Sequence, residues 1–249
     1  MRLTDDIVLV AGGPLFGFGL TVGTDAHCYL IDGGDELALV DCGMGSDASA
    51  EMLLEAVRAA GCDPERISTL LITHYHADHA AGAARYRREL GLQVMASAAA
   101  AEAMEAADHQ RTAFAPAQAL GLFPPDASYP ACPVDRRLGP GEVIEVGRLS
   151  IRVLPTPGHC SGHLAYLVEG SDRRSLLSGD ALFAGGKIYL QAIGDCDLQA
   201  SLASIRSLAE VEFDALLPGH GPIALTGGRQ HLDIALHAIE GLSVPGSLA

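Results

Sequence analysis

The feature of the sequence that could do chemistry most directly is a short segment with three histidines and one aspartate within six positions. It has the pattern HxHxDH and contains His74, His76, Asp78 and His79. The segment follows the apolar run at residues 70–72, which predicts a buried strand, so we expect the motif on the loop at the end of that strand. Packing gives no reason to crowd these side chains together, whereas borderline metal ions such as Zn²⁺ bind ligands of these types.

Three further candidate ligands occur at similar places farther along the chain. His159, Asp180 and His220 each follow a short apolar run that predicts a strand. In layered β structures, residues at the ends of several strands converge on one rim. The strand ends can therefore bring seven ligands to one place, a number that suits two metal ions rather than one.

Together these motifs resemble those of the metallo-β-lactamase-fold superfamily of metallo-hydrolases, over roughly residues 20–225. The stretches TPGHCSGH at residues 156–163 and GDALF at residues 179–183 are most similar to the glyoxalase II branch. The resemblance also implies that His163 orients one of the ligands. The ligand sets it implies are His74, His76 and His159 for a first metal ion, Asp78, His79 and His220 for a second, and Asp180 as a bridge between the two.

The activity expected from this resemblance is hydrolysis of a thioester, an ester or a lactone. Two divalent metal ions can share a water molecule and lower its pKa, so that a bridging hydroxide attacks a carbonyl carbon. Asp78 is expected to orient the hydroxide or pass a proton to the leaving group, and Asp180 to hold the metal ions at a fixed separation. Thiolates and alkoxides need little protonation to leave, whereas the amide nitrogen of a β-lactam needs more, so β-lactams are disfavoured as substrates. Zn²⁺ is expected first, and Fe or Mn would suit the same ligands.

Two other functions stay open at this point. The chain also resembles persulfide dioxygenases in its length and in the pattern PGHxxGH, and those enzymes use a single Fe(II) held by two histidines and one aspartate. The complete second ligand set, with His79 and His220, argues mildly for two metal ions instead. The third hypothesis is a non-catalytic metal-binding protein, which the intact set of seven ligands disfavours. The identity and number of bound metal ions would separate the first two.

Candidate substrate contacts lie in two segments. Phe16 and Phe18 belong to a glycine-rich stretch that can either form a lip over the site or pack on the sheet as a hairpin tip. Phe183 occupies a position where acyl-homoserine lactonases often carry a tyrosine. Lys187 and Tyr189 resemble residues that contact glutathione in glyoxalase II enzymes, although here they can instead meet a substrate carboxylate or lie at the surface.

An insert is expected at residues 97–130, between the HxHxDH motif and His159. Its sequence predicts an alanine-rich helix followed by a proline-containing loop, and we expect it to form a helical cap beside the metal site. Its apolar side chains could line an acyl pocket or pack the insert onto the body of the protein. These side chains are Met104, Phe114, Leu120, Leu122 and Phe123.

The order of strands and helices predicts the fold. Strands that precede helices in both halves favour an α/β (α+β) fold, namely a four-layer αββα sandwich with two sheets packed face to face. We expect a single domain over residues 1–249 that includes the insert. The main predicted strands are 7–10, 28–31, 37–40, 93–96, 143–146, 150–154 and 164–168, and the main helices are 49–60, 80–90, 197–209 and 229–242.

Composition agrees with a soluble enzyme, and a small-molecule substrate is expected. The formal net charge of −15 disfavours binding to nucleic acid, whose phosphates would be repelled. There is neither a signal-peptide pattern nor an apolar run long enough to span a membrane, so no membrane partner and a cytoplasmic location are expected. Six scattered cysteines without a CxxC pair predict free thiols. A homodimer stays open as an alternative to a monomer.

Overall fold

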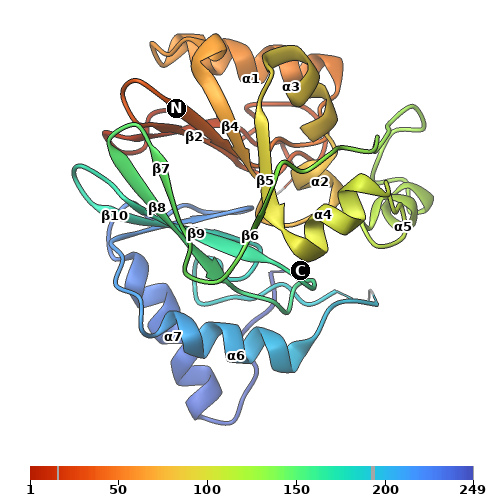
Figure 1. The fold of residues 1–249 in the computed structure, drawn as a ribbon. Coiled ribbons are helices and arrows are strands. Elements are labelled where there is room, and N and C mark those ends of the chain that lie inside the picture. The colour runs from red at the N-terminus through yellow and green to blue at the C-terminus, as the bar shows by residue number, and fades with distance from the viewer. Residues whose placement is uncertain (16, 192–193, 249) are drawn as a thin grey trace.

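Two β-sheets lie face to face at the centre of the structure, and helices cover the outer surface of each sheet (Figure 1). The structure is a computed structural model that describes residues 1–15, 17–191 and 194–248. The first sheet contains β1 Ile7–Ala11, β2 Cys28–Asp32, β3 Leu37–Val40, β4 Ile67–Leu71, β5 Gln93–Ser97 and β6 Arg136–Leu138, in that order. The second contains β11 Ala215–Pro218, β10 Arg174–Gly179, β9 Leu164–Glu169, β8 Leu149–Pro155 and β7 Val143–Val146, in that order.

The helices complete the outer layers, and the predicted four-layer αββα sandwich is confirmed. Helices α1 and α3 lie outside the first sheet, and α6 and α7 lie outside the second, while α4 and α5 lie to one side (Figure 1). Their bounds are α1 Asp47–Ala59, α2 Ala77–Ala80, α3 Ala83–Leu90, α4 Ala98–Glu105, α5 Phe114–Ala119, α6 Leu198–Leu208 and α7 Gly228–Glu240. Among the described residues, no helix is both long and apolar enough to cross a membrane.

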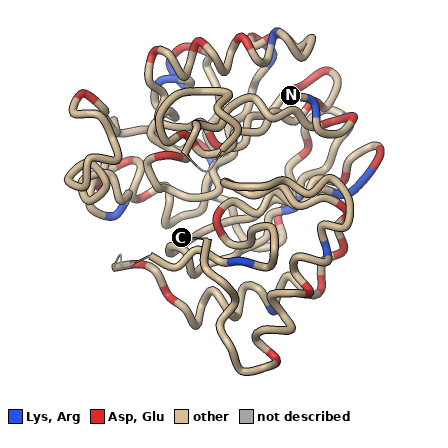
Figure 2. The backbone as a smooth tube through the Cα atoms, turned by 180° about the vertical axis from the view of Figure 1, so that it is seen from behind, with Lys and Arg blue, Asp and Glu red and all other residues tan. Residues whose placement is uncertain are grey.

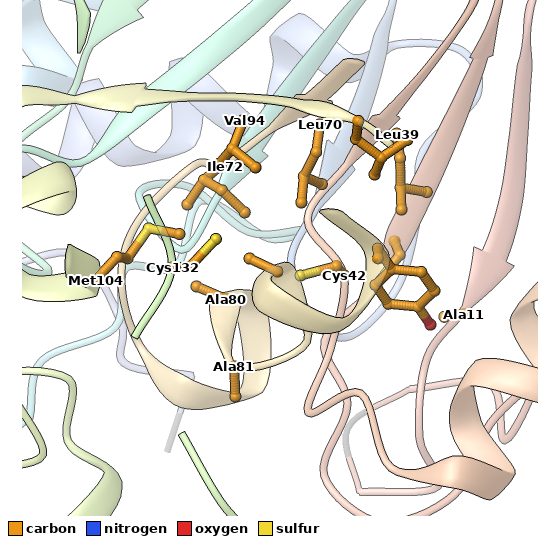
Figure 3. Packing of buried hydrophobic residues seen from close by; sticks show 14 of the residues in the cluster. Ala11, Leu39, Cys42, Leu70, Ile72, Ala80, Ala81, Val94, Met104 and Cys132 are labelled. Carbon is orange, nitrogen blue, oxygen red and sulfur yellow. The ribbon is translucent and has the colours of Figure 1, made fainter. Parts of the chain in front are cut away.

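Three apolar clusters hold the layers together, because successive side chains of a strand point to opposite faces of its sheet. In β1, Val8 and Val10 belong to the cluster beneath the outer helices, whereas Ile7 and Leu9 belong to the cluster between the sheets. The third cluster lies between the second sheet and helices α6 and α7. Figure 3 shows part of the first cluster, which contains Leu39 of β3, Leu70 of β4 and Val94 of β5 together with Met104 of α4.

Local sequence signals account for the ends of several helices. The Ser46 side chain caps α1 by accepting a hydrogen bond of 3.2 Å from the Ser49 backbone N–H. The Asp197 side chain caps α6 in the same way by accepting from the Gln199 and Ala200 backbone N–H groups. Helix α3 ends at Gly91, whose φ of +71° lies in the left-handed region that glycine adopts readily.

The HxHxDH motif differs from its prediction in one respect. Only its first half lies on a loop, because α2 already begins at Ala77 and places Asp78 and His79 in a helical turn. The backbone N–H of Ala80 donates to the His76 carbonyl at 2.9 Å, which starts this turn. Alanine has the highest helix propensity, so the alanines within and after the motif favour an earlier helix start than the apolar pattern indicated.

The strand directions bring the candidate ligands to one edge of the sandwich. Strands β3 and β4 are parallel, and so are β10 and β11, while β9 runs antiparallel to its neighbours β8 and β10. The carboxyl ends of β8, β10 and β11 therefore share one edge of the second sheet. His159, Asp180 and His220 follow these three strands, and the HxHxDH motif follows β4.

Candidate metal centre

A first group of ligands consists of His74, His76 and His159, all of them buried. Each offers a ligand atom, and these atoms lie within 4.8 Å of one another. His159 Nε2 lies 2.9 Å from His76 Nδ1, so the two nitrogens face each other across the site. A tetrahedral metal ion with ordinary metal–nitrogen bonds would hold its ligand nitrogens about 3.3 Å apart. The spacing of these rings is therefore close to what a shared metal ion requires.

A second group consists of Asp78, His79 and His220, whose ligand atoms also lie within 4.8 Å of one another. His220 Nε2 is 3.3 Å from His79 Nε2 and 3.1 Å from Asp78 Oδ2. Two nitrogens and a carboxylate oxygen thus converge beside the first group. The second group draws on both sheets, since His220 follows β11 and the other two residues lie in α2, after β4.

Asp180 lies between the two groups. Its Oδ1 atom is 3.4 Å from His79 Nε2, in the second group. Its Oδ2 atom is 3.6 Å from His159 Nε2, in the first group, and 3.6 Å from His220 Nε2. One carboxylate therefore faces both groups, which is the arrangement predicted for a bridging ligand.

Asp41 lies behind the candidate ligands and accepts hydrogen bonds from Thr73 and His79, a role that the sequence did not predict. It follows β3 with a φ of +56°, and its carboxylate is buried. Its Oδ1 accepts from the Thr73 backbone N–H at 2.8 Å, while its Oδ2 accepts from Thr73 Oγ1 at 2.7 Å and His79 Nδ1 at 2.8 Å. Thr73 Oγ1 in turn lies 3.0 Å from His74 Nδ1. Asp41 therefore orients a residue of each group, and such outer contacts set ring orientation at metal sites.

His163, predicted to orient a ligand, lies directly behind Asp180. Its Nε2 accepts a hydrogen bond of 3.0 Å from the Asp180 backbone N–H. Its other ring nitrogen, Nδ1, is 2.8 Å from Thr156 Oγ1 and donates to it in that tautomer. The imidazole thereby ties the loop after β8 to the loop after β10, and its orienting role stays a prediction.

Burial and charge set the protonation of the ligands in the metal-free protein. Burial lowers the pKa of His76 to about 3, and it also lowers that of His74 well below the ordinary value. Burial would raise the pKa of Asp78, yet the nearby His79 and His220 bring it down to about 2. For His79 burial would lower the pKa, but Asp180, Asp78 and Asp41 raise it well above the usual range. His74 and His76 are thus neutral, which is the form of histidine that binds a metal ion. His79 favours the protonated form and would lose a proton when a metal ion binds.

The candidate ligands include buried polar atoms that lack a partner within the described part of the chain. His74 Nε2 and Asp180 Oδ1 are buried and have no hydrogen-bond partner among the residues that the structure describes. Buried polar atoms normally have one, so two such atoms within a cluster of imidazoles and carboxylates call for a bound group. Imidazole nitrogens and carboxylate oxygens are ligands of divalent metals such as Zn²⁺, Fe²⁺ and Mn²⁺, and the residues fit metal binding.

A cavity of about 310 Å³ opens onto the ligands. Of the predicted substrate contacts, Tyr189 lines this cavity and stacks on His159 with the ring centroids 5.4 Å apart. Phe18 lies elsewhere and stacks on His27, while Phe183 is fully buried and does not reach the cavity. Lys187 is exposed and is not part of the cavity wall. Phe16 lies outside the described residues.

Comparison with known proteins identifies the family. The sequence profile of the Metallo-beta-lactamase superfamily matches residues 22–220, which contain every ligand described above. This chain belongs to that superfamily. The fold agrees, since a metallo-beta-lactamase family protein of Thermus thermophilus superposes with a TM-score of 0.71 at 25% identity, covering 97% of this chain and 82% of the other. A subclass B3 metallo-beta-lactamase of Bradyrhizobium japonicum gives a TM-score of 0.71 at 21% identity, with 97% and 91% covered.

Curated relatives match over a shorter part of the chain. A hydroxyacylglutathione hydrolase of Rhodopseudomonas palustris (strain BisB5) is 30% identical over 165 residues, which are 66% of this chain and 50% of the relative. An atrochrysone carboxyl ACP thioesterase of Aspergillus fumigatus is 27% identical over 197 residues, or 79% of this chain and 51% of the relative. The matched region therefore spans about half the length of these relatives.

Proposed function

We propose that this protein is a hydrolase that uses two divalent metal ions, with Zn²⁺ as the first expectation, to cleave a thioester, an ester or a lactone. The observation that carries the proposal is the position of Asp180, whose two oxygens face two separate groups of ligands. Membership of the superfamily and the names of the relatives, a hydroxyacylglutathione hydrolase and an ACP thioesterase, support hydrolysis and favour thioesters.

The chain's own residues would act as follows. Metal ions bound by the two groups would supply an activated water molecule and polarise the substrate carbonyl. Asp180 would keep the groups at a fixed separation, with His163 and Asp41 holding the ligands in orientation. Asp78 lines the cavity, so its carboxylate can reach the substrate and pass a proton to the leaving group.

The first test combines metal analysis with turnover. Protein purified without chelator should contain about two equivalents of a divalent metal and should hydrolyse members of a thioester, ester and lactone panel. His76→Ala should lose metal and turnover, since it removes a ligand of the first group. His237→Ala, a matched change at an exposed histidine of α7, should leave both unchanged.

Other results would favour the alternatives. About one equivalent of iron together with oxygen uptake on a persulfide would replace the hydrolase by a dioxygenase. Bound metal with no turnover of any substrate in either assay would indicate a non-catalytic metal-binding protein. We expect a small-molecule substrate and no membrane or nucleic-acid partner. The absence of a nucleic-acid partner is expected because acidic positions outnumber basic ones 31 to 16 and are spread over the backbone (Figure 2).

A further inference from the structure

The cavity beside the metal centre has an apolar wall. Beyond the ligands and Ala77, which lies between two of them, its surface is formed by side chains from four separate segments of the chain. These are Leu15 and Thr24 before β2, Ala113, Ala117, Leu122 and Phe123 of the insert, Tyr189 and Gln191 after β10, and Leu248 near the carboxyl end. Six of these nine residues are aliphatic or phenylalanine, and the volume of about 310 Å³ is that of a small-molecule site.

The insert divides its apolar residues between two roles. Met104 and Phe114 are buried in the cluster beneath the first sheet and do not reach the cavity. Leu122 and Phe123 line the cavity, although Phe123 also stacks on Phe114 with centroids 5.7 Å apart. Leu122 is 50% exposed, so part of its side chain is free to contact an apolar group in the cavity. The insert thus contributes both to the core and to the substrate side of the metal centre.

No positive side chain lines the cavity among the described residues. Its charged groups other than histidine are Asp78 and Asp180, which belong to the metal centre. Arg111, on the insert, is held away over the Tyr75 ring, 5.2 Å from its centroid, where it also pairs with Glu102. A carboxylate at the far end of an acyl chain, against the apolar wall and away from the metal ligands, would therefore be desolvated without a cation to pair with it, which carries a penalty.

We infer that the cavity binds an uncharged, aliphatic acyl chain, so that the preferred substrates are medium-chain acyl esters or thioesters rather than acylglutathione-type ones. This inference rests on the proposed function. The acyl group stays attached to the carbonyl that must reach the metal ligands, and the cavity opens directly onto those ligands. Glutathione carries two carboxylates, for which this wall offers no Lys or Arg among the described residues.

The experiment varies the acyl chain while the leaving group stays constant. Acetyl, butyryl, hexanoyl and octanoyl thioesters of N-acetylcysteamine are given to the metal-loaded protein. Each added methylene that is buried should raise kcat/KM about fourfold until the cavity is full. A succinyl thioester, which has the length of butyryl and a terminal carboxylate, should react about tenfold more slowly than butyryl or worse. An S-acylglutathione should gain nothing over the same acyl group on N-acetylcysteamine.

A pair of variants locates the chain in the cavity. Ala117→Leu adds a larger side chain at the wall from within α5, and it should lower kcat/KM for octanoyl about tenfold while sparing acetyl. Ala119→Leu makes the same change at an exposed position of α5 that is not part of the wall, and it should leave the chain-length profile unchanged. Equal profiles in the two variants would overturn the assignment.

A binding measurement keeps the inference separate from the proposed function. Calorimetry with the product carboxylates should give octanoate binding at least tenfold tighter than butyrate, and Ala117→Leu should abolish the difference. If no member of the thioester, ester and lactone panel is turned over but this difference is found, the hydrolase proposal fails and the acyl cavity stands. If thioesters are turned over without dependence on chain length, or the succinyl or glutathione substrates are preferred, the acyl cavity is wrong and the hydrolase stands.

Discussion

Replacing Asp41 by asparagine should weaken the second ligand group more than the first, because Asp41 contacts His79 directly and reaches His74 only through Thr73. The Asp41 carboxylate takes three hydrogen bonds of 2.7–2.8 Å, two from Thr73 and one from His79 Nδ1. An asparagine has one acceptor oxygen fewer, and its amide would present a donor either to the His79 N–H or to Thr73. A lost bond to a charged group costs about 1.5–3 kcal/mol, and losing the outer partner of a ligating histidine costs about 10–100-fold in metal affinity.

The assay is a metal titration against a competing chelator, which resolves a tight and a weak site. In Asp41→Asn, the affinity of one site should fall about 10–100-fold while the other stays within about threefold of its original value. Thr73→Val provides the matched comparison, because it removes the oxygen beside His74 Nδ1 and leaves the contact between Asp41 and His79 in place. That variant should weaken the first group instead.

The reasoning would be refuted by either of two results. If both sites of Asp41→Asn weaken equally, the carboxylate supports the whole loop rather than His79. If neither affinity changes while circular dichroism and melting temperature stay normal, the orientation of His79 does not depend on Asp41 at all.

Three further outcomes follow from the packing and the charges. Burial would raise the pKa of Asp6, but hydrogen bonds from Ser171 and Arg148 lower it below its ordinary value. The ionised Asp6 should therefore stabilise the fold fully above the unfolded pKa, near 3.9, and this contribution should disappear as the pH falls through the lower folded pKa. Denaturant curves of Asp6→Asn and the original protein should differ at pH 7 and converge in acid. Leu53→Ala, at a fully buried position of α1, should reduce the free energy of unfolding by about 2–5 kcal/mol, whereas Leu242→Ala, at a residue 97% exposed, should change it by less than about 0.5 kcal/mol in the same urea titration. Removing metal with a chelator should lower the melting temperature. Restoring a free metal concentration of about 1,000 times the Kd should raise the free energy of unfolding by about 4 kcal/mol. An unchanged melting curve would contradict metal binding to the folded state.

The apolar periodicity predicted most strands because alternation is a local property. Strand β7 was predicted at its observed bounds because buried and exposed positions alternate along it. Strand β3 was also predicted at its observed bounds, but from a continuous run of four apolar residues that are all buried. Strand β6 was missed, because two of its residues, Arg136 and Arg137, are exposed at the edge of the sheet. A short edge strand with charged side chains carries no alternating signal of its own.

The candidate site shows where local reasoning stops. Each predicted ligand was found from its type and its place after an apolar run, and the structure brings all seven together. Asp41 has the same signal, an aspartate directly after the apolar run of β3, yet it contacts ligands from behind rather than facing the cavity. Which strand ends face the site depends on neighbouring strands and loop paths that no local pattern contains. Phe183 was misplaced for a similar reason, since the turn it forms with Lys187 directs the ring inward.

The contact between His159 and the backbone of Tyr189 lets the cavity wall change without changing the orientation of this ligand. His159 Nδ1 donates to the backbone carbonyl of Tyr189 at 3.2 Å, so the orientation of this ligand needs the path of the chain but not the side chain at position 189. The wall side chains before β2, in the insert and near the carboxyl end come from segments that supply no ligand. Substitutions there can alter which acyl group is accepted while the geometry of the ligands persists. If the proposed function holds, single substitutions in these segments would change the substrate while the candidate ligands keep their positions.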